Sequence, residues 1–449
     1  MTSTLAPEQH YLDEFARLER ELKATGPSWL HSLRRAALAR FAETGFPDRR
    51  NEEWKYTQLA RVTETAFQRR AGVGGHVAST QTRAISGLRG ARIVFVDGVF
   101  SAQDSELDAA TEGISVTSVS ELLEHDPESL RAQLSARLPA KGGAFTALNA
   151  AFFSDGVVLR VRAGVRSETT IQFIHVTTGA AAAALPVHHL RNAILLERGA
   201  QAQFVEKWLG EPSGVATAGS LTNSWTEVLL EDGAVFDHVK LECEDPRAQH
   251  IAALRVSLGR SSAYTNHYLS AGAGLARNEI EVSLAGEESH CTLNGLFVAG
   301  SKRHVDCHTV LQHLVPNCRS WEVYRGILGG HASGVFRGRI NVHANAQKTD
   351  AKQSSRSLLL SADATMNTKP CLEIYADDVK CTHGATIGEL DAIALFYLRS
   401  RGLNLPQATN MLVHAFASEV LEAIAAPEVR AHATEILESE LRAIQVGAE

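Results

Sequence analysis

The stretch Leu195-Leu-Glu-Arg-Gly-Ala200 returns further along the chain as Leu229-Leu-Glu-Asp-Gly-Ala234. Each copy ends an apolar run with two charged residues and a glycine, which is the pattern of a strand, a turn and a second strand. From Phe145 onward, similar short alternating segments are separated by Gly, Asn, Asp or Ser; they include residues 157–162, 170–176, 255–258, 279–284 and 339–343. The region predicts a stacked β architecture, either a solenoid or a large sandwich.

The chain before this β region mixes helices and strands. Apolar residues recur at helical spacing over residues 11–22 and 30–41, which predicts two antiparallel helices. Residues 91–100 predict two strands joined by a tight turn at Asp97-Gly98, because this dipeptide tolerates positive φ. Helical spacing returns over residues 118–138. Between these parts, we expect the segment from Gly45 to Thr57 to be a loop held by Trp54 and Tyr56 packing on the body.

The chain after the β region is predicted to be helical to its end. We expect Gly384 and Gly388 to break the last strand, and the strongly apolar run from Leu390 to form a helix buried on several sides. Pro406 and Pro427 suit the first turns of two further helices. The last helix carries an apolar stripe that needs either the protein's own β body or a second chain to cover it.

Composition narrows the classes of partner. The chain has 449 residues and a formal charge of −7 at pH 7, without a basic block, which argues against nucleic acid or an anionic membrane as the main partner. No apolar run approaches the ~20 residues that span a bilayer, and the N-terminus lacks a signal pattern. We expect a cytoplasmic protein with free thiols, since the six cysteines are scattered.

Signatures of phosphate and acyl chemistry are missing. The sequence has no G-x-x-x-x-G-K-[ST] loop and no G-x-G-x-x-G between a strand and a helix, so we expect no nucleotide site in this chain. It also lacks the G-x-S-x-G elbow of serine hydrolases.

One histidine pattern is a candidate metal site. In His304-Val-Asp-Cys-His308, alternation puts His304, Asp306 and His308 on one face of a strand. Three such side chains could bind a divalent metal in a cupin-like mononuclear enzyme. The alternative is structural, because an inward His–Asp pair can be a satisfied polar rung of a β stack.

The second candidate is Cys381-Thr-His383, within Pro370-Cys-Leu-Glu-Ile-Tyr-Ala-Asp-Asp-Val-Lys-Cys-Thr-His-Gly-Ala-Thr386. Cys381 and His383 would lie side by side on one strand face, about 6–7 Å apart at the backbone. Two ligands cannot complete a tetrahedral site, so the pair needs donors from elsewhere in the chain or from another subunit. Cys371 is a weaker candidate, and we treat the remaining cysteines as structural: Cys243, Cys291, Cys307 and Cys318.

The segment from Pro370 to Gly388, with Leu395-Phe-Tyr-Leu-Arg-Ser-Arg-Gly402 after it, closely resembles the C-terminal signature of the SufB/SufD family of iron–sulfur cluster assembly proteins. The resemblance covers most of the chain, because it also extends through earlier segments: Gln347-Lys-Thr-Asp-Ala-Lys-Gln353, His304-Val-Asp306, Phe145-Thr-Ala-Leu-Asn149 and Glu53-Trp-Lys-Tyr-Thr57. The His-Gly-Ala-Thr form and the Trp-Lys-Tyr segment resemble the SufD rather than the SufB branch.

This resemblance implies a right-handed parallel β-helix with an N-terminal helical and α/β region and a C-terminal helical domain. The corresponding division here is residues 1–144, 145–387 and 388–449. It also implies a subunit of the SufBCD complex that pairs with a SufB-like homologous subunit through the β-helix and binds a SufC-like ABC ATPase through the C-terminal helices.

The site residues carried over from the family are His383 and, secondarily, Cys381, as ligands of a transient iron–sulfur cluster shared with the partner subunit. We therefore expect a non-catalytic scaffold subunit, which in isolation could also form a homodimer. Two alternatives stay open: a cupin-like metalloenzyme that uses His304, Asp306 and His308, and a purely structural β-solenoid adaptor.

Overall fold

The computed structural model describes residues 7–22, 26–69, 84–107, 112–134, 143–178, 185–210 and 219–446. The C-terminal part of the segment expected to be helical up to residue 138 lies outside the described residues.

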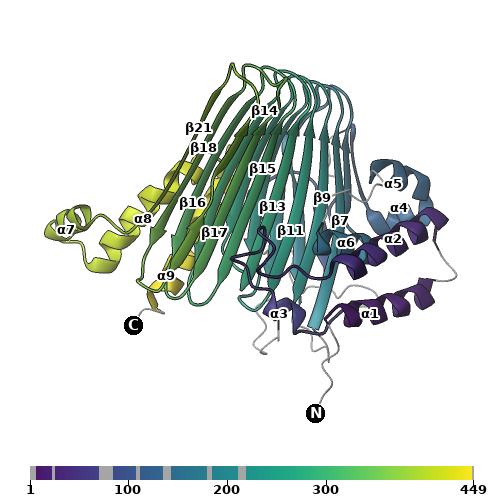
Figure 1. The fold of residues 1–449 in the computed structure, drawn as a ribbon, viewed down its shortest axis with the longest axis horizontal. Helices are drawn as coiled ribbons and strands as arrows, with labels where there is room; N and C mark the ends of the chain where they lie inside the picture. The colour runs from purple at the N-terminus through teal and green to yellow at the C-terminus, as the bar shows by residue number, and fades with distance from the viewer. Residues whose placement is uncertain are drawn as a thin grey trace, which may run out of the picture.

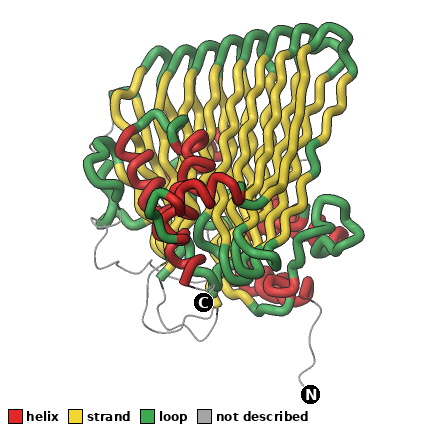
Figure 2. The backbone as a smooth tube through the Cα atoms, turned by 90° about the vertical axis from the view of Figure 1, so that its left-hand side faces the viewer, coloured by secondary structure: helices red, strands yellow, loops and turns green. Residues whose placement is uncertain are grey.

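The centre of the molecule is a β-solenoid of about seven turns (Figures 1 and 2). Along the solenoid, successive strands alternate between two sheets, and each strand pairs in parallel with its neighbours two places along the chain. The first sheet, called sheet A, contains β4 (Ile114–Ser118), β5 (Val157–Val161), β7 (Leu185–Leu196), β9 (Leu221–Leu230), β11 (Gln249–Leu258), β13 (Leu275–Leu284), β15 (His304–His313), β17 (Ser333–Val342), β19 (Thr365–Thr368) and β20 (Cys371–Ile374), with β1 (Phe67–Arg69) beside β7. Sheet B contains β3 (Val99–Phe100), β2 (Arg92–Val96), β6 (Arg166–Thr177), β8 (Gln201–Gly210), β10 (Val235–Cys243), β12 (Ala263–Ser270), β14 (His290–Ala299), β16 (Arg319–Leu328), β18 (Asp350–Leu359) and β21 (Lys380–Gly388).

The strands stack in register, so that equivalent side chains form columns along the solenoid. Leu196, Leu230, Leu258 and Leu284 follow one another as paired residues on four successive strands of sheet A, and none is exposed. The repeated sequence forms the end of a sheet A strand and the turn that follows it in two successive coils. In these turns Gly199 and Gly233 have φ of 67° and 69°. The solenoid alternative is thus confirmed, and the sandwich alternative is wrong.

Helices cover the start of the solenoid. The bounds are α1 (Pro7–Leu22), α2 (Ser28–Thr44), α3 (Ala60–Thr63), α4 (Val119–His125), α5 (Pro127–Gln133) and α6 (Ala144–Phe152). The aromatic rings of Tyr11, Phe41 and Phe152 pack edge to face in the core between α1, α2 and α6. The expected hairpin is also present: β2 and β3 are antiparallel, and Asp97 and Gly98 both have positive φ.

Two C-terminal helices, α8 (Leu405–Leu421) and α9 (Pro427–Val446), lie against sheet B (Figures 1 and 2). Val413 and Leu437 are fully buried in an apolar cluster that includes Leu296 and Ile327 of the sheet. The apolar stripe of the last helix is therefore covered by the protein's own β body. No helix in the described part of the chain is long and apolar enough to cross a membrane.

Two expectations for the segment between sheet and helices are wrong. Helix α7 (Ala392–Ser400) has no buried residue, and Ile393 and Phe396 are 80% and 73% exposed, because the helix projects away from the solenoid (Figure 1). Gly384 does not break the strand, although Gly388 is its last residue as expected. Strand β21 continues through Gly384, since its pairing with β18 is unbroken from Lys380 to Gly388 and this ladder outweighs the weak strand propensity of glycine.

The column packing predicts the effect of a small substitution. A Cβ added at Gly295 in β14 would lie 2.2 Å from the ring of the buried Tyr324, so Gly295→Ala should lower the free energy of unfolding by ~1–3 kcal/mol. The control is Gly388→Ala, where no atom lies within 4 Å and the change should be within ~0.5 kcal/mol. Equal unfolding midpoints for the two variants would contradict this packing.

Candidate functional site

The last coil of the solenoid ends in two strands with one free edge each. Among the described strands, β21 pairs only with β18, and β20 pairs only with β17. Eight of the nine residues of β21 are exposed and Cys381 is half-buried, as expected for a strand that no further coil covers. The backbone N–H and C=O groups on the outer edge of β21 are therefore available for pairing.

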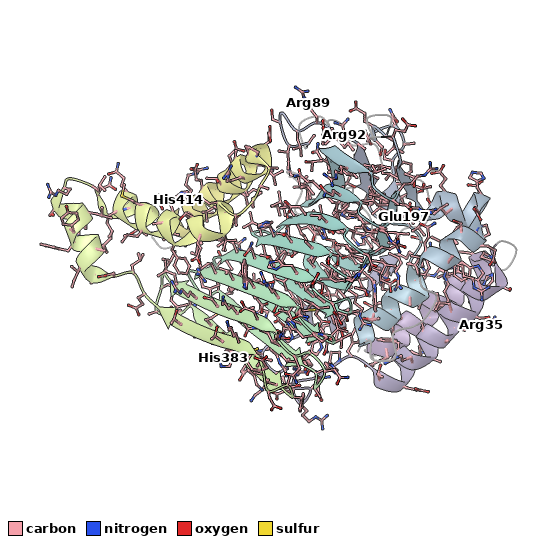
Figure 3. All side chains as sticks on the ribbon, turned by 90° about the horizontal axis from the view of Figure 1, so that it is seen from above. Arg35, Arg89, Arg92, Glu197, His383 and His414 are labelled. Carbon is pink, nitrogen blue, oxygen red and sulfur yellow. The ribbon has the colours of Figure 1, made fainter. Side chains whose placement is uncertain are left out.

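Cys381 and His383 occupy this terminal strand. They pair in register with Ala351 and Gln353, which are buried, so both candidate ligands lie on the side of β21 that faces the solenoid interior. The shared face predicted from the sequence is consistent with this register. The two side chains differ in exposure: Cys381 packs against the core, whereas His383 is exposed at the edge of the sheet (Figure 3).

The protonation of Cys381 follows from its position. Burial raises the pKa of the Cys381 thiol, so the free protein holds it as the neutral thiol at pH 7. A metal ion would have to displace that proton before the sulfur could bind. Cys381 is accordingly the less available donor of the pair.

The other cysteines are placed differently. Cys371, on β20, pairs with the outward-facing Arg339, and its sulfur lies 3.9 Å from Glu373 Oε1. The four cysteines treated as structural are buried or packed in apolar clusters: Cys243, Cys291, Cys307 and Cys318. All six lie within the described residues and are free thiols. No group of three His, Cys, Asp or Glu side chains that could hold a metal occurs among the described residues.

His304, Asp306 and His308 lie together on the outer face of sheet A, but their polar atoms are already occupied. Thr57 Oγ1 lies 2.9 Å from His304 Nε2 and donates to Asp306 Oδ2 at 2.5 Å. His308 Nε2 lies 2.9 Å from Asp306 Oδ1, and His304 Nδ1 lies 2.6 Å from Ser333 Oγ. Each of the three side chains thus has a partner within the protein.

The residue that sequence analysis missed in this cluster is Arg277. Its fully buried guanidinium is ion-paired with Asp306 and Glu279, and it lies 3.8 Å from the centre of the Trp54 ring. Because Arg277 pairs in register with Asp306 on the next strand, only the solenoid register brings them together. A permanent cation next to Asp306 opposes a divalent metal there, which favours the structural alternative.

The charges of this cluster shift its pKa values. Burial alone would raise the pKa of the Asp306 carboxyl, but Arg277 and His308 outweigh burial and hold that pKa well below its usual range. Burial opposes protonation of His308, yet Asp306 and Glu53 raise the His308 pKa. The cluster is therefore a charged network that holds the segment around Trp54 on sheet A. Trp54 is buried as expected, whereas Tyr56 is 45% exposed and does not hold the loop.

The fold and the site together define a β-solenoid protein with an uncovered terminal strand that carries an exposed histidine and a half-buried cysteine. Residues 175–416 match the family model "SUF system FeS cluster assembly, SufBD core domain", and residues 5–173 match the model "SufBD protein N-terminal region". The chain therefore belongs to the SufB/SufD family of iron–sulfur cluster assembly proteins.

Two relatives illustrate how far the similarity extends. The iron–sulfur cluster assembly protein SufD of Escherichia coli is 31% identical, over 86% of this chain and 87% of its own. An iron–sulfur cluster assembly SufBD family protein of Synechocystis is 28% identical, over 90% and 89% of the two chains. The chain is thus a SufD homologue.

The charged network predicts that Arg277 stabilises the fold. Arg277→Met leaves the Asp306 carboxylate buried without its counter-charge and should lower the free energy of unfolding by ~3–5 kcal/mol. The matched control Arg255→Met removes a half-exposed pair with Glu281 (3.3 Å) and should cost less than ~1 kcal/mol. Thermal unfolding and metal analysis of the purified variants test this. A stable Arg277→Met protein that binds stoichiometric divalent metal would support the metalloenzyme alternative instead.

Proposed function

We propose that this chain is a non-catalytic scaffold subunit for iron–sulfur cluster assembly, acting in a SufBCD-type complex. In this proposal His383, with Cys381 as the secondary ligand, contributes to a transient cluster that a SufB-like homologous subunit completes. A SufC-like ABC ATPase binds the C-terminal helices. The observation that carries the proposal is the exposed His383 on an edge strand that nothing in the described chain covers.

The open end supports pairing with another solenoid. A long, uncovered edge strand invites addition of a strand from a partner, and natural proteins usually block such edges unless they are used. Large apolar side chains gather around this end: Ile374, Tyr375 and Ile387 are 39%, 66% and 44% exposed. Apolar area beside free backbone groups is what a stable subunit interface would bury. In isolation the same edge could pair with a second copy.

The chemistry of the two donors supports a transient cluster. Neutral imidazole binds iron and releases it more readily than thiolate does, which suits a cluster that is handed on. His383 has no hydrogen-bond partner in the described part of the chain, so it is free to bind. Since one chain supplies at most two donors, the remaining ligands would come from the homologous subunit.

Helix α7 supports a second partner. It projects from the body with Ile393, Phe396 and Tyr397 exposed, the last by 56%. Aromatic and aliphatic side chains of this kind form the central contacts of protein interfaces. An ATPase in this place would supply the nucleotide chemistry for which the sequence carries no phosphate-binding loop.

His383 provides the first test. His383→Ala should leave unfolding and subunit association unchanged but lower the yield of cluster on the complex by more than about tenfold. Iron, sulfide and visible absorbance are measured on the reconstituted complex, together with co-elution of the subunits. The control is Thr382→Ala, which alters an exposed residue of the same strand. Normal maturation with His383→Ala would favour the structural adaptor.

The exposed side of α7 provides the second test. The double substitution Ile393→Glu and Phe396→Glu should weaken ATPase binding by about tenfold or more, because it puts charge at the centre of the proposed contact. Leu229→Glu is the matched control, since Leu229 is 48% exposed on sheet A. Truncation after Gly402 would remove α8 and α9 and expose the apolar face of sheet B that they cover. Point substitutions on α7 avoid this loss of packing. Unchanged ATPase affinity would refute this contact.

A further inference from the structure

A polar column leads through the solenoid interior to His383. Glu322 on β16, Gln353 on β18 and His383 on β21 are successive partners in the in-register ladder of sheet B. Glu322 and Gln353 are 1% and 3% exposed, whereas His383 at the end of the column is exposed. A buried carboxyl and a buried amide therefore lie directly behind the candidate iron ligand.

The orientation of the Gln353 amide is fixed by Glu322. Gln353 Nε2 donates to Glu322 Oε2 at 2.6 Å, so the carboxyl group determines which end of the amide is the nitrogen. Gln353 Oε1 is buried and accepts no hydrogen bond in the described structure. It is an unused acceptor on the residue that pairs in register with His383.

The opposite sheet leaves space for this amide. A Cβ added at Gly338 of β17 would lie 2.2 Å from Gln353 Nε2 and 2.7 Å from its Cδ. The backbone of Gly338 does not have positive φ, so the turn geometry of the chain does not require glycine at this position. The absence of a side chain at Gly338 instead accommodates the Gln353 side chain.

We propose that Gln353 is a positioning residue for His383: its Oε1 accepts the N–H of one imidazole nitrogen while the other nitrogen binds iron. Glu322 orients the amide. This inference rests on the proposed ligand role of His383 and adds the group that sets its tautomer. Histidine ligands commonly donate the second ring N–H to such an acceptor, and removing it typically costs about 10- to 100-fold in metal affinity.

The ionised form of Glu322 suits this role. Its carboxylate has no proton to donate, so it can only accept from Gln353 Nε2 and leaves Gln353 Oε1 unused. Burial raises the pKa of Glu322 to about 7, so the carboxylate form predominates above neutral pH.

The test is a double-mutant cycle on the complex reconstituted with the homologous subunit, iron and sulfide. With His383 present, Gln353→Leu should lower cluster yield by about 10-fold or more. In the His383→Cys background, Gln353→Leu should lower cluster yield by less than about twofold, because a thiolate ligand carries no N–H that could donate to Gln353. Gly338→Ala, which displaces the amide but keeps it, should cause a smaller loss. Gln312→Leu is the matched control on the outer face of sheet A.

The outcomes separate the two levels of the proposal. An unchanged yield with His383→Ala overturns both the ligand role and this inference. A large loss with His383→Ala but none with Gln353→Leu overturns this inference alone, as does an equal loss from Gln353→Leu in both backgrounds. Where His383→Cys assembles no cluster, pulsed EPR of the reduced complex decides. The quadrupole coupling of the remote imidazole nitrogen should change in Gln353→Leu, and an unchanged coupling refutes the hydrogen bond.

Discussion

In-register parallel stacking is the constraint on which the rest of this structure depends. Each coil satisfies the backbone edges of the coil before it and places like side chains in columns, as in the leucine column through Leu196 and Leu284. A solenoid built this way always has two ends at which the pairing stops. Whether an end is capped or left open decides whether another chain can pair with it.

The two ends are treated differently. At the start, antiparallel strands close both sheets, since β4 pairs with β5 and β3 pairs with β2, and residues of α2, α4 and α5 pack on Val158 of β5. At the finish, β20 and β21 keep a free edge among the described strands, and α8 and α9 cover a face of sheet B rather than its end. The stacking energy of the coils holds the terminal strand in place while its outer edge stays open. A ligand on that strand is thus rigidly mounted and accessible, as a shared metal site requires.

The sequence predicted those features that depend on local pattern. The repeated turn at Gly199 and Gly233, the hairpin at Asp97-Gly98 and the alternation of Cys381 and His383 all follow from the period of a strand and from positive φ. What it could not predict depends on register. Arg277 contacts Asp306, and Gln353 pairs in register with His383, only because coils of unequal sequence length align in space. The exposure of α7 escaped prediction for a related reason: an apolar helix looks the same whether its own chain or another chain covers it.

The histidines of the solenoid differ in whether their ring nitrogens already have partners within the protein. His304 and His308 are surrounded by Thr57, Asp306 and Arg277, so a new ligand would have to break buried hydrogen bonds and an ion pair. His383 has no such partner in the described structure, and it pairs in register with Gln353, whose buried Oε1 accepts no hydrogen bond among the described residues. A buried acceptor without a donor is unfavourable in the free protein. In the proposed site, an imidazole N–H that donates to Gln353 Oε1 would remove this unfavourable state, which would add to the free energy of ligand binding.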